Sequence, residues 1–333
     1  MWHNRFCGKC LMVSFCFFLL TGCSATKANR KQYDEGLAFV QENKWEEAID
    51  SFGNALSQES KGSKLSISEQ ILNKKACYAM GVGYYKIQNY EKAEKYLEEA
   101  LSISYLKNWD EEIKNYQVDN FCAMDEYEKA YDVILSLRED NQNDFSYLFR
   151  AYFILDALGK ENEKEELLQE GLSIKGKGEE YQFNQAKIRY FLGDLKEAKK
   201  GMKLASDNNI EQAFFYLGRI YEDNQKYDKA ISCYEAYTSA LEAENDFVNL
   251  HIAACYEKSG DYESALNVYE TAIEKSDGSY RKQLRYNQIV TLEKDTQYEE
   301  AFEKCKAYMK VYKEDAAMKK EYEFLETRVQ TEE

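Results

Sequence analysis

The chain has 333 residues, no proline and only 16 glycines, while 44% of its residues are hydrophobic and 31% are charged. The lack of these helix-breaking residues favours an all-α fold, and the apolar fraction suffices for a sizeable core. The formal net charge of −16 disfavours nucleic acids and anionic lipid surfaces as electrostatic partners.

The N-terminus is the first distinct segment. Arg5 and Lys9 form a short positive region that precedes an apolar run at residues 11–20, and this run is too short to span a bilayer. The letters LTGC that end at Cys23 resemble the bacterial lipobox. The resemblance implies that residues 1–22 are a lipoprotein signal peptide and that Cys23 receives diacylglycerol and acyl chains such as palmitate. The alternative is an ordinary signal peptide that contains a cysteine.

Residues 23–32 are polar, and we interpret them as a tether that follows the lipid. Two or more lipid chains anchor a protein stably. We therefore expect a protein anchored by lipid to the cell membrane on its extracytoplasmic face, either in the periplasm or at the cell surface. The cysteines beyond Cys23 are odd in number and contain no CxxC pair, so we expect buried thiols rather than a disulfide framework. They are Cys77, Cys122, Cys233, Cys255 and Cys305.

One environment recurs between residues 33 and 313. In most copies an alanine follows a large side chain by three residues and precedes another by four, and these offsets lie on one helical face. The seven alanines are Ala48, Ala93, Ala130, Ala198, Ala230, Ala265 and Ala301. The interval between Ala130 and Ala198 is 68 residues, or twice 34, which predicts a degenerate unit centred on Lys164.

Most units also carry glycine or alanine twelve positions before the central residue, where a small side chain lets two helices pack closely. This pattern resembles the tetratricopeptide repeat (TPR), a helical hairpin of 34 residues. The segment 214–234 matches best, whereas the closing proline of the repeat is missing throughout and the unit at 145–172 lacks the small residue. The resemblance implies an α-solenoid of about eight TPR-like hairpins over residues 33–313, wound as a right-handed superhelix. An apolar stripe predicts a C-terminal capping helix over residues 315–330.

Catalysis finds no support in the sequence. Beyond the signal segment His251 is the single histidine, and the chain contains no HExxH, EF-hand or P-loop motif. Pairs of acidic residues are expected by chance among 60 acidic side chains. We therefore predict a protein that is not an enzyme and uses no cofactor or metal.

In the resembled family the first helices of the hairpins line a concave surface. The corresponding positions here are rich in aromatic residues, which serve as anchors in binding surfaces. The predicted ligand-binding groove consists of Tyr78, Tyr85, Phe149, Phe153, Phe183, Tyr190, Phe215, Arg219 and Tyr286. The alternative for each ring is packing between neighbouring first helices.

These features predict a membrane-anchored, non-catalytic scaffold for protein–protein interactions in the bacterial cell envelope, which binds a peptide or a helix. The alternative is a component of an assembly machinery, or a protein that binds an envelope glycan or polysaccharide through the same groove. One subclass of the family clamps an acidic peptide C-terminus with lysine and asparagine side chains. That ligand is disfavoured because the matching positions lack lysine; they are Tyr33, Leu37, Tyr78, Val82, Asn115 and Asp119.

Overall fold

The computed structural model describes residues 24–57, 64–241, 245–276, 278 and 280–329. These ranges hold 17 α-helices, one short 3-10 helix and no strand, which confirms the predicted all-α fold. The predicted signal peptide and Cys23 lie outside the described residues. Among the helices that the structure describes, none combines the length and the apolar character needed to cross a membrane.

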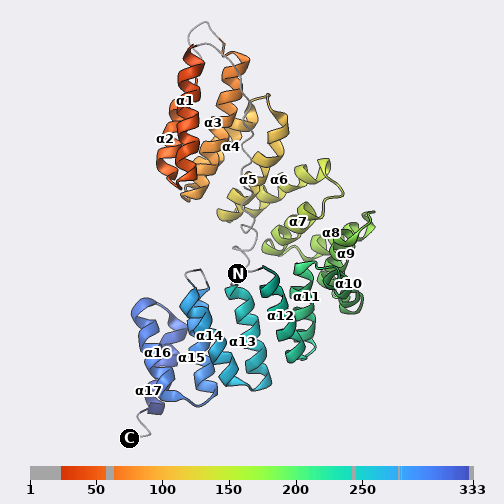
Figure 1. Cartoon of the computed structure of the whole chain (residues 1–333), viewed down its shortest axis with the longest axis vertical. Coiled ribbons are helices and arrows are strands. Elements are labelled where there is room, and N and C mark those ends of the chain that lie inside the picture. Colours follow the sequence, from red (N-terminus) through yellow and green to blue (C-terminus); the bar gives the residue numbers. More distant parts are fainter. Residues whose placement is uncertain (1–23, 58–63, 242–244, 277, 279, 330–333) are drawn as a thin grey trace. The chain divides into compact units, whose positions relative to one another are not determined.

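The chain divides into two compact units, and the first comprises Met1–Ile174. Its described part holds four helical hairpins in which each helix packs on the next (Figure 1). The pairs are α1 (Ser24–Gln41) with α2 (Trp45–Ala55), α3 (Ile67–Lys86) with α4 (Tyr90–Ser102), α5 (Asp110–Ala123) with α6 (Tyr127–Asp140), and α7 (Phe145–Ala157) with α8 (Glu161–Ser173). The 3-10 helix η1 (Lys107–Trp109) precedes α5.

The second unit, Lys175–Glu333, repeats this arrangement. The pairs are α9 (Glu179–Phe191) with α10 (Leu195–Asp207), α11 (Glu211–Asp223) with α12 (Tyr227–Leu241), α13 (Asp246–Ser259) with α14 (Tyr262–Lys275), and α15 (Arg281–Lys294) with α16 (Tyr298–Val311). A last helix, α17 (Ala316–Val329), packs on α16. The described residues thus contain the eight predicted hairpins and the predicted C-terminal helix.

The N-terminal polar segment is helical from Ser24 onwards, because α1 begins there and runs to Gln41. Residues 24–32 of the predicted polar tether therefore belong to this helix. No proline or glycine interrupts residues 24–35, and Lys31 pairs with Glu35 one turn later at 3.4 Å, so nothing in this stretch stops the first helix from extending backwards.

The spacing of small residues explains how each hairpin closes. All seven repeat alanines are completely buried. In the sixth hairpin Gly218 lies on α11 against the ring of Tyr234 on α12, and a Cβ atom added to Gly218 would lie 2.5 Å from that ring. Gly36 and Phe52 stand in the same relation, also at 2.5 Å. The small residue twelve before the alanine therefore makes room for the large one four after it.

The eight hairpins share one turn. The residue five before each central position has a positive φ, and these residues are Asn43, Gln88, Asp125, Gly159, Gly193, Gln225, Gly260 and Thr296. The next residue donates its backbone N–H to a carbonyl in the last turn of the first helix, as Lys44 does to Phe39 and Gln297 to Leu292, both at 2.9 Å. This is a Schellman-type helix end, which satisfies carbonyls that the helix leaves free.

The fourth hairpin follows the same rule although it lacks the alanine. Gly159 has a φ of 67°, and the backbone N–H of Lys160 bonds to Leu155 at 3.0 Å. Lys164 occupies the central position and is buried, with its ammonium group paired to Asp156 and to Glu161. The predicted degenerate unit is confirmed, and an ion pair compensates for the charge at its contact.

Candidate functional site

The nine predicted groove residues lie on first helices, but the structure places them in two environments. Tyr78, Phe149 and Phe183 are buried, with 1%, 3% and 1% of their surface exposed. All three stand fifteen positions before a central residue, but so do the half-buried Phe215 and Tyr286, so this position alone does not decide whether a ring is buried. These three rings are part of the packed core. The other six, Tyr85, Phe153, Tyr190, Phe215, Arg219 and Tyr286, are half-buried.

In the first unit the predicted rings form a small cluster between α3 and α5. Tyr116 lies between Tyr78 and Tyr85, at centroid distances of 5.8 and 6.1 Å. The hydroxyl of Tyr78 donates a hydrogen bond of 2.7 Å to Glu112. On α7, the ring of Phe153 packs on that of its neighbour Tyr152 at a centroid distance of 5.2 Å. The rings of Tyr78, Tyr85 and Tyr116 thus form one packed group on α3 and α5.

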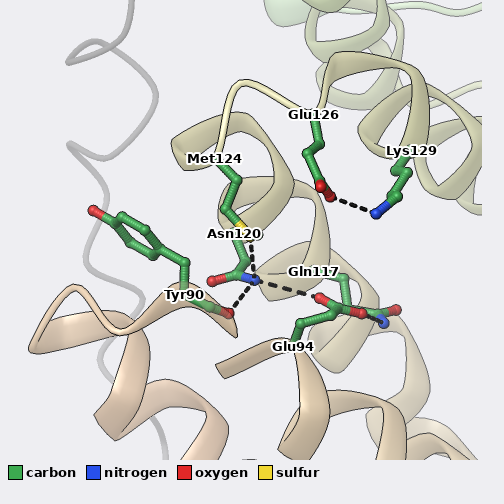
Figure 2. A network of polar contacts seen from close by, with 7 residues as sticks. All are labelled: Tyr90, Glu94, Gln117, Asn120, Met124, Glu126 and Lys129. Carbon is green, nitrogen blue, oxygen red and sulfur yellow. Dashed lines mark hydrogen bonds and ion pairs between the residues drawn. The ribbon is translucent and has the colours of Figure 1, made fainter. Parts of the chain in front are cut away.

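A buried polar network links α4 to α5 in this unit. Figure 2 shows the Nδ2 group of Asn120 directed at the carbonyl of Tyr90 and at Glu94, at 3.0 and 3.4 Å. Gln117 donates a further bond of 2.6 Å to Glu94. Asn120 is completely buried, so this network joins the second hairpin to the third and is closed to a ligand.

The second unit brings half-buried rings together along α9, α11 and α13. We call this set the aromatic surface; it consists of Tyr190, Phe191, Phe215, Tyr216, Phe247 and His251. The ring of Tyr216 lies 5.2 Å from Tyr190 and 5.7 Å from Phe215. Phe215 lies 5.9 Å from Phe247 on α13. The rings of the aromatic surface therefore pack on one another across three helices.

Five predicted site residues lie in this unit, of which Tyr190 and Phe215 belong to the aromatic surface and Phe183, Arg219 and Tyr286 do not. Tyr190 and Phe215 are joined through Tyr216, and Arg219 follows Tyr216 by one helical turn. Tyr286, on α15, instead packs on Tyr308 at 6.4 Å. Tyr216 and His251 were missed as site residues. They stand fourteen positions before a central residue, one position from the set chosen from the sequence, and a scan of adjacent helical positions would have found them.

The aromatic surface is bordered by a carboxylate with several donors. Glu222 accepts hydrogen bonds from Tyr234 and Lys258, both at 2.8 Å, and lies 3.0 Å from Nδ1 of His251. Burial by itself raises the pKa of Glu222, but the hydrogen bonds from His251, Lys258 and Tyr234 outweigh it and lower the pKa to about 2. Glu222 is therefore ionised, and its carboxylate contacts Tyr234, His251 and Lys258.

A similar arrangement follows one repeat later, where Glu257 accepts bonds from Tyr269 at 2.7 Å and Thr291 at 2.8 Å and pairs with Lys294 at 2.5 Å. In both cases the lysine belongs to the next hairpin. Each carboxylate therefore ties its own buried tyrosine to the neighbouring repeat, which is a structural role.

The described part of the chain holds no group of three or more His, Cys, Asp or Glu side chains arranged to bind a metal ion. Its five cysteines are free thiols, of which Cys77, Cys255 and Cys305 are buried. The arrangement is thus one of packed rings and engaged charges on rigid helices, which suits binding of another molecule by contact.

Comparison with known proteins agrees with this architecture. Three segments match models of the tetratricopeptide repeat, at residues 74–105, 211–240 and 250–279. They correspond to the hairpins α3–α4, α11–α12 and α13–α14. A search among curated proteins gave no significant match to the sequence.

Solved structures extend the likeness to most of the chain. A tetratricopeptide repeat protein from Parabacteroides merdae ATCC 43184 is 16% identical, with a TM-score of 0.58 over 80% of this chain and 99% of that one. The human IFIT1 dimer with m7Gppp-AAAA is 15% identical, with a TM-score of 0.54 over 88% of this chain and 78% of that one. At these identities the similarity shows the fold, an α-solenoid of TPR-like hairpins.

Proposed function

We propose that this protein is a non-catalytic scaffold that binds an extended peptide or a helix of a partner protein at the aromatic surface of its second unit. The observation that carries the proposal is the continuous contact from Tyr190 through Tyr216 and Phe215 to Phe247, made by rings that remain half-exposed. Rigid aromatic side chains supply contact area at low cost in conformational entropy.

The proposed location is the extracytoplasmic face of the cell membrane, with the chain anchored through lipid on Cys23. The support is the lipobox-like LTGC that follows a short apolar run. Confinement to a membrane raises the effective concentration of the scaffold for partners on the same surface, so a modest intrinsic affinity suffices.

Two other ligand classes compete with a protein partner. Half-exposed tyrosine rings also stack on sugars, so an envelope glycan is the second candidate. A human structure with the same fold contains a capped RNA, but the net charge of −16 in the present chain disfavours a nucleic acid.

A pair of aromatic substitutions tests the protein-scaffold proposal. The double variant Phe215→Ala and Phe247→Ala should lose an envelope protein that co-purifies with the full chain. Phe324→Ala on α17 is the matched control, because that ring is 38% exposed and lies outside the aromatic surface. Equal recovery of the protein by all three chains would reject the proposal, and selective retention of a polysaccharide would favour the glycan.

A further inference from the structure

One end of the first unit brings together the start of α1 and the connections between its hairpins. The Nδ2 group of Asn29 on α1 donates a hydrogen bond of 2.7 Å to Ser57, just beyond α2. The backbone N–H of Ser57 in turn bonds to Oδ1 of Asn73 on α3 at 2.8 Å. One residue later, Nζ of Lys74 donates a bond of 3.0 Å to the carbonyl of Ile103, just beyond α4. We call this end the proximal edge; it comprises residues 24–31, 64–67 and 103–109.

The predicted lipid site directly adjoins the proximal edge. Cys23 immediately precedes Ser24, where α1 begins, so the lipid is joined to the first unit by a helix rather than by a polar linker. At a rise of 1.5 Å per residue, Asn29 lies only about 8 Å along the helix from its start. A lipid on Cys23 that is buried in a bilayer therefore holds this edge close to the membrane surface.

Apolar and aromatic side chains are exposed at the same edge. Ile67, the first residue of α3, has 58% of its surface exposed. Trp109 is half-buried, with its ring packed on Tyr78 at 5.7 Å and Nζ of Lys75 lying 5.5 Å from its centroid. Tyr105, in the loop before η1, is half-buried too. Tryptophan and tyrosine are enriched at the boundary between membrane and water, because an apolar ring and a polar N–H or O–H group suit that boundary.

The charge of the proximal edge differs from that of the whole chain. Residues 24–33 of α1 carry Lys27, Arg30 and Lys31, and the first acidic residue of this helix is Asp34. Lys107 is exposed on η1. A lysine or arginine close to an anionic lipid surface contributes about 1 kcal/mol to binding. The net charge of −16 thus leaves a basic start of α1 beside the predicted lipid site.

The acidic residues nearest this edge are bonded within the first unit. The pairs are Asp110 with Lys74 at 2.5 Å, Glu111 with Tyr147 at 2.6 Å, Glu112 with Tyr78 at 2.7 Å, and Glu69 with the backbone N–H of Ser66 at 2.7 Å. These bonds hold the carboxylates against neighbouring groups, which lessens their repulsion of an anionic surface.

We propose that the proximal edge lies in the headgroup layer of the bilayer that holds the lipid of Cys23. Ile67 and the indole ring of Trp109 insert at the boundary with the acyl chains. Lys27, Lys31 and Lys107 lie beside the headgroup phosphates. The inference rests on the lipid anchor of the proposed function and is independent of the aromatic surface. It turns the anchor into a fixed contact, because lipid and protein surface bind the membrane together.

The tryptophans of the chain provide a matched pair of probes. Trp2, Trp45 and Trp109 are the only three, and Trp2 precedes Cys23. Trp45 is half-buried like Trp109, but it begins α2 at the other end of the hairpin. Ile49, one turn after Trp45, lies against Gly83, which is about 12 Å further along α3 than Lys75, the residue beside Trp109.

Quenching of tryptophan fluorescence by brominated acyl chains tests the contact. The full chain is purified from membranes and reconstituted into vesicles of equal parts phosphatidylcholine and phosphatidylglycerol, with and without bromine on the acyl chains. Every variant carries Trp2→Phe; adding Trp45→Phe reports on Trp109, and adding Trp109→Phe reports on Trp45. Bromine should roughly halve the emission of Trp109, because interfacial side chains reach about 5–10 Å into the headgroup and acyl boundary, and should leave that of Trp45 nearly unchanged.

A second pair of variants and the mass of the purified chain separate the edge from the anchor. Ile67→Glu should weaken the quenching of Trp109, whereas Leu204→Glu, at a site that is 48% exposed on α10, should not. A lipid-bearing chain whose Trp109 is not quenched, or is quenched no more than Trp45, rejects the edge and keeps the anchor. A chain without lipid that binds the vesicles with Trp109 alone quenched keeps the edge and rejects the anchor. A chain without lipid that does not bind the vesicles rejects both.

Discussion

The substitution Thr296→Gly should stabilise the protein. Thr296 is the left-handed residue of the last hairpin turn, with a φ of 59°, and it is the only β-branched residue among the eight equivalent positions. A non-glycine residue in this region costs about 1–2 kcal/mol, whereas glycine there costs only the extra entropy of the unfolded chain, about 0.5–1 kcal/mol. We therefore expect a net gain of about 0.5–1 kcal/mol in the free energy of unfolding.

A matched control makes the sign of this effect decisive. Thr271 is an exposed threonine inside α14, so Thr271→Gly should destabilise by a few tenths of a kcal/mol, since glycine is the poorer helix former. Urea denaturation followed by circular dichroism compares the two variants with the native chain. Destabilisation by both substitutions would refute the turn geometry and with it the register of the hairpins.

Three further predictions probe other parts of the chain. Ala230→Glu should lower the free energy of unfolding by about 3 kcal/mol or more, because it overpacks a fully buried contact with an unpaired charge. The control Ala240→Glu, at an exposed site on the same helix, should change the free energy of unfolding by less than about 0.5 kcal/mol. Equal melting temperatures of the two variants would contradict the packing. Burial and the charge of Glu321 raise the pKa of Glu293 to about 7 from an unfolded value of 4.5. The contribution of protonated Glu293 to stability is therefore complete below pH 4.5 and is lost as the pH rises through 7. Glu293→Gln should stabilise the protein by about 1 kcal/mol near pH 8 and have little effect near pH 5. A difference in melting temperature between variant and native chain that does not change with pH would exclude a raised pKa for Glu293. Cys23→Ala should abolish metabolic labelling by an alkyne analogue of palmitate and release the chain from the membrane fraction, whereas persistent labelling would disprove lipidation at Cys23.

The hairpin architecture was predictable because small residues at fixed spacing govern the helix contacts in most hairpins. Ala230 and Gly218 must both be small for α11 and α12 to approach, so their spacing carries the fold in the sequence. Even the degenerate hairpin could be found from its interval. The ion pair of Lys164 with Asp156 could not be predicted, because a lysine can replace the buried alanine only where the turn brings a carboxylate close to it.

The candidate site was predictable only in outline. A first helix packs both on its own partner and on the neighbouring hairpins, so its buried arc is wider than one hairpin's pattern indicates. Phe183 lies in the core, whereas Phe215, at the equivalent position of the next hairpin, is half-buried, so the position in the repeat does not by itself specify burial. The partners of Glu222 come from positions 12 to 36 residues away, which no local pattern specifies.

The most direct test of the scaffold proposal is photo-crosslinking in living cells. A photoreactive amino acid at position 215 should give an adduct with one discrete partner protein, and the same amino acid at the exposed position 200 on α10 should give none. Adducts of equal yield at both positions, or none at position 215, would contradict binding at the aromatic surface.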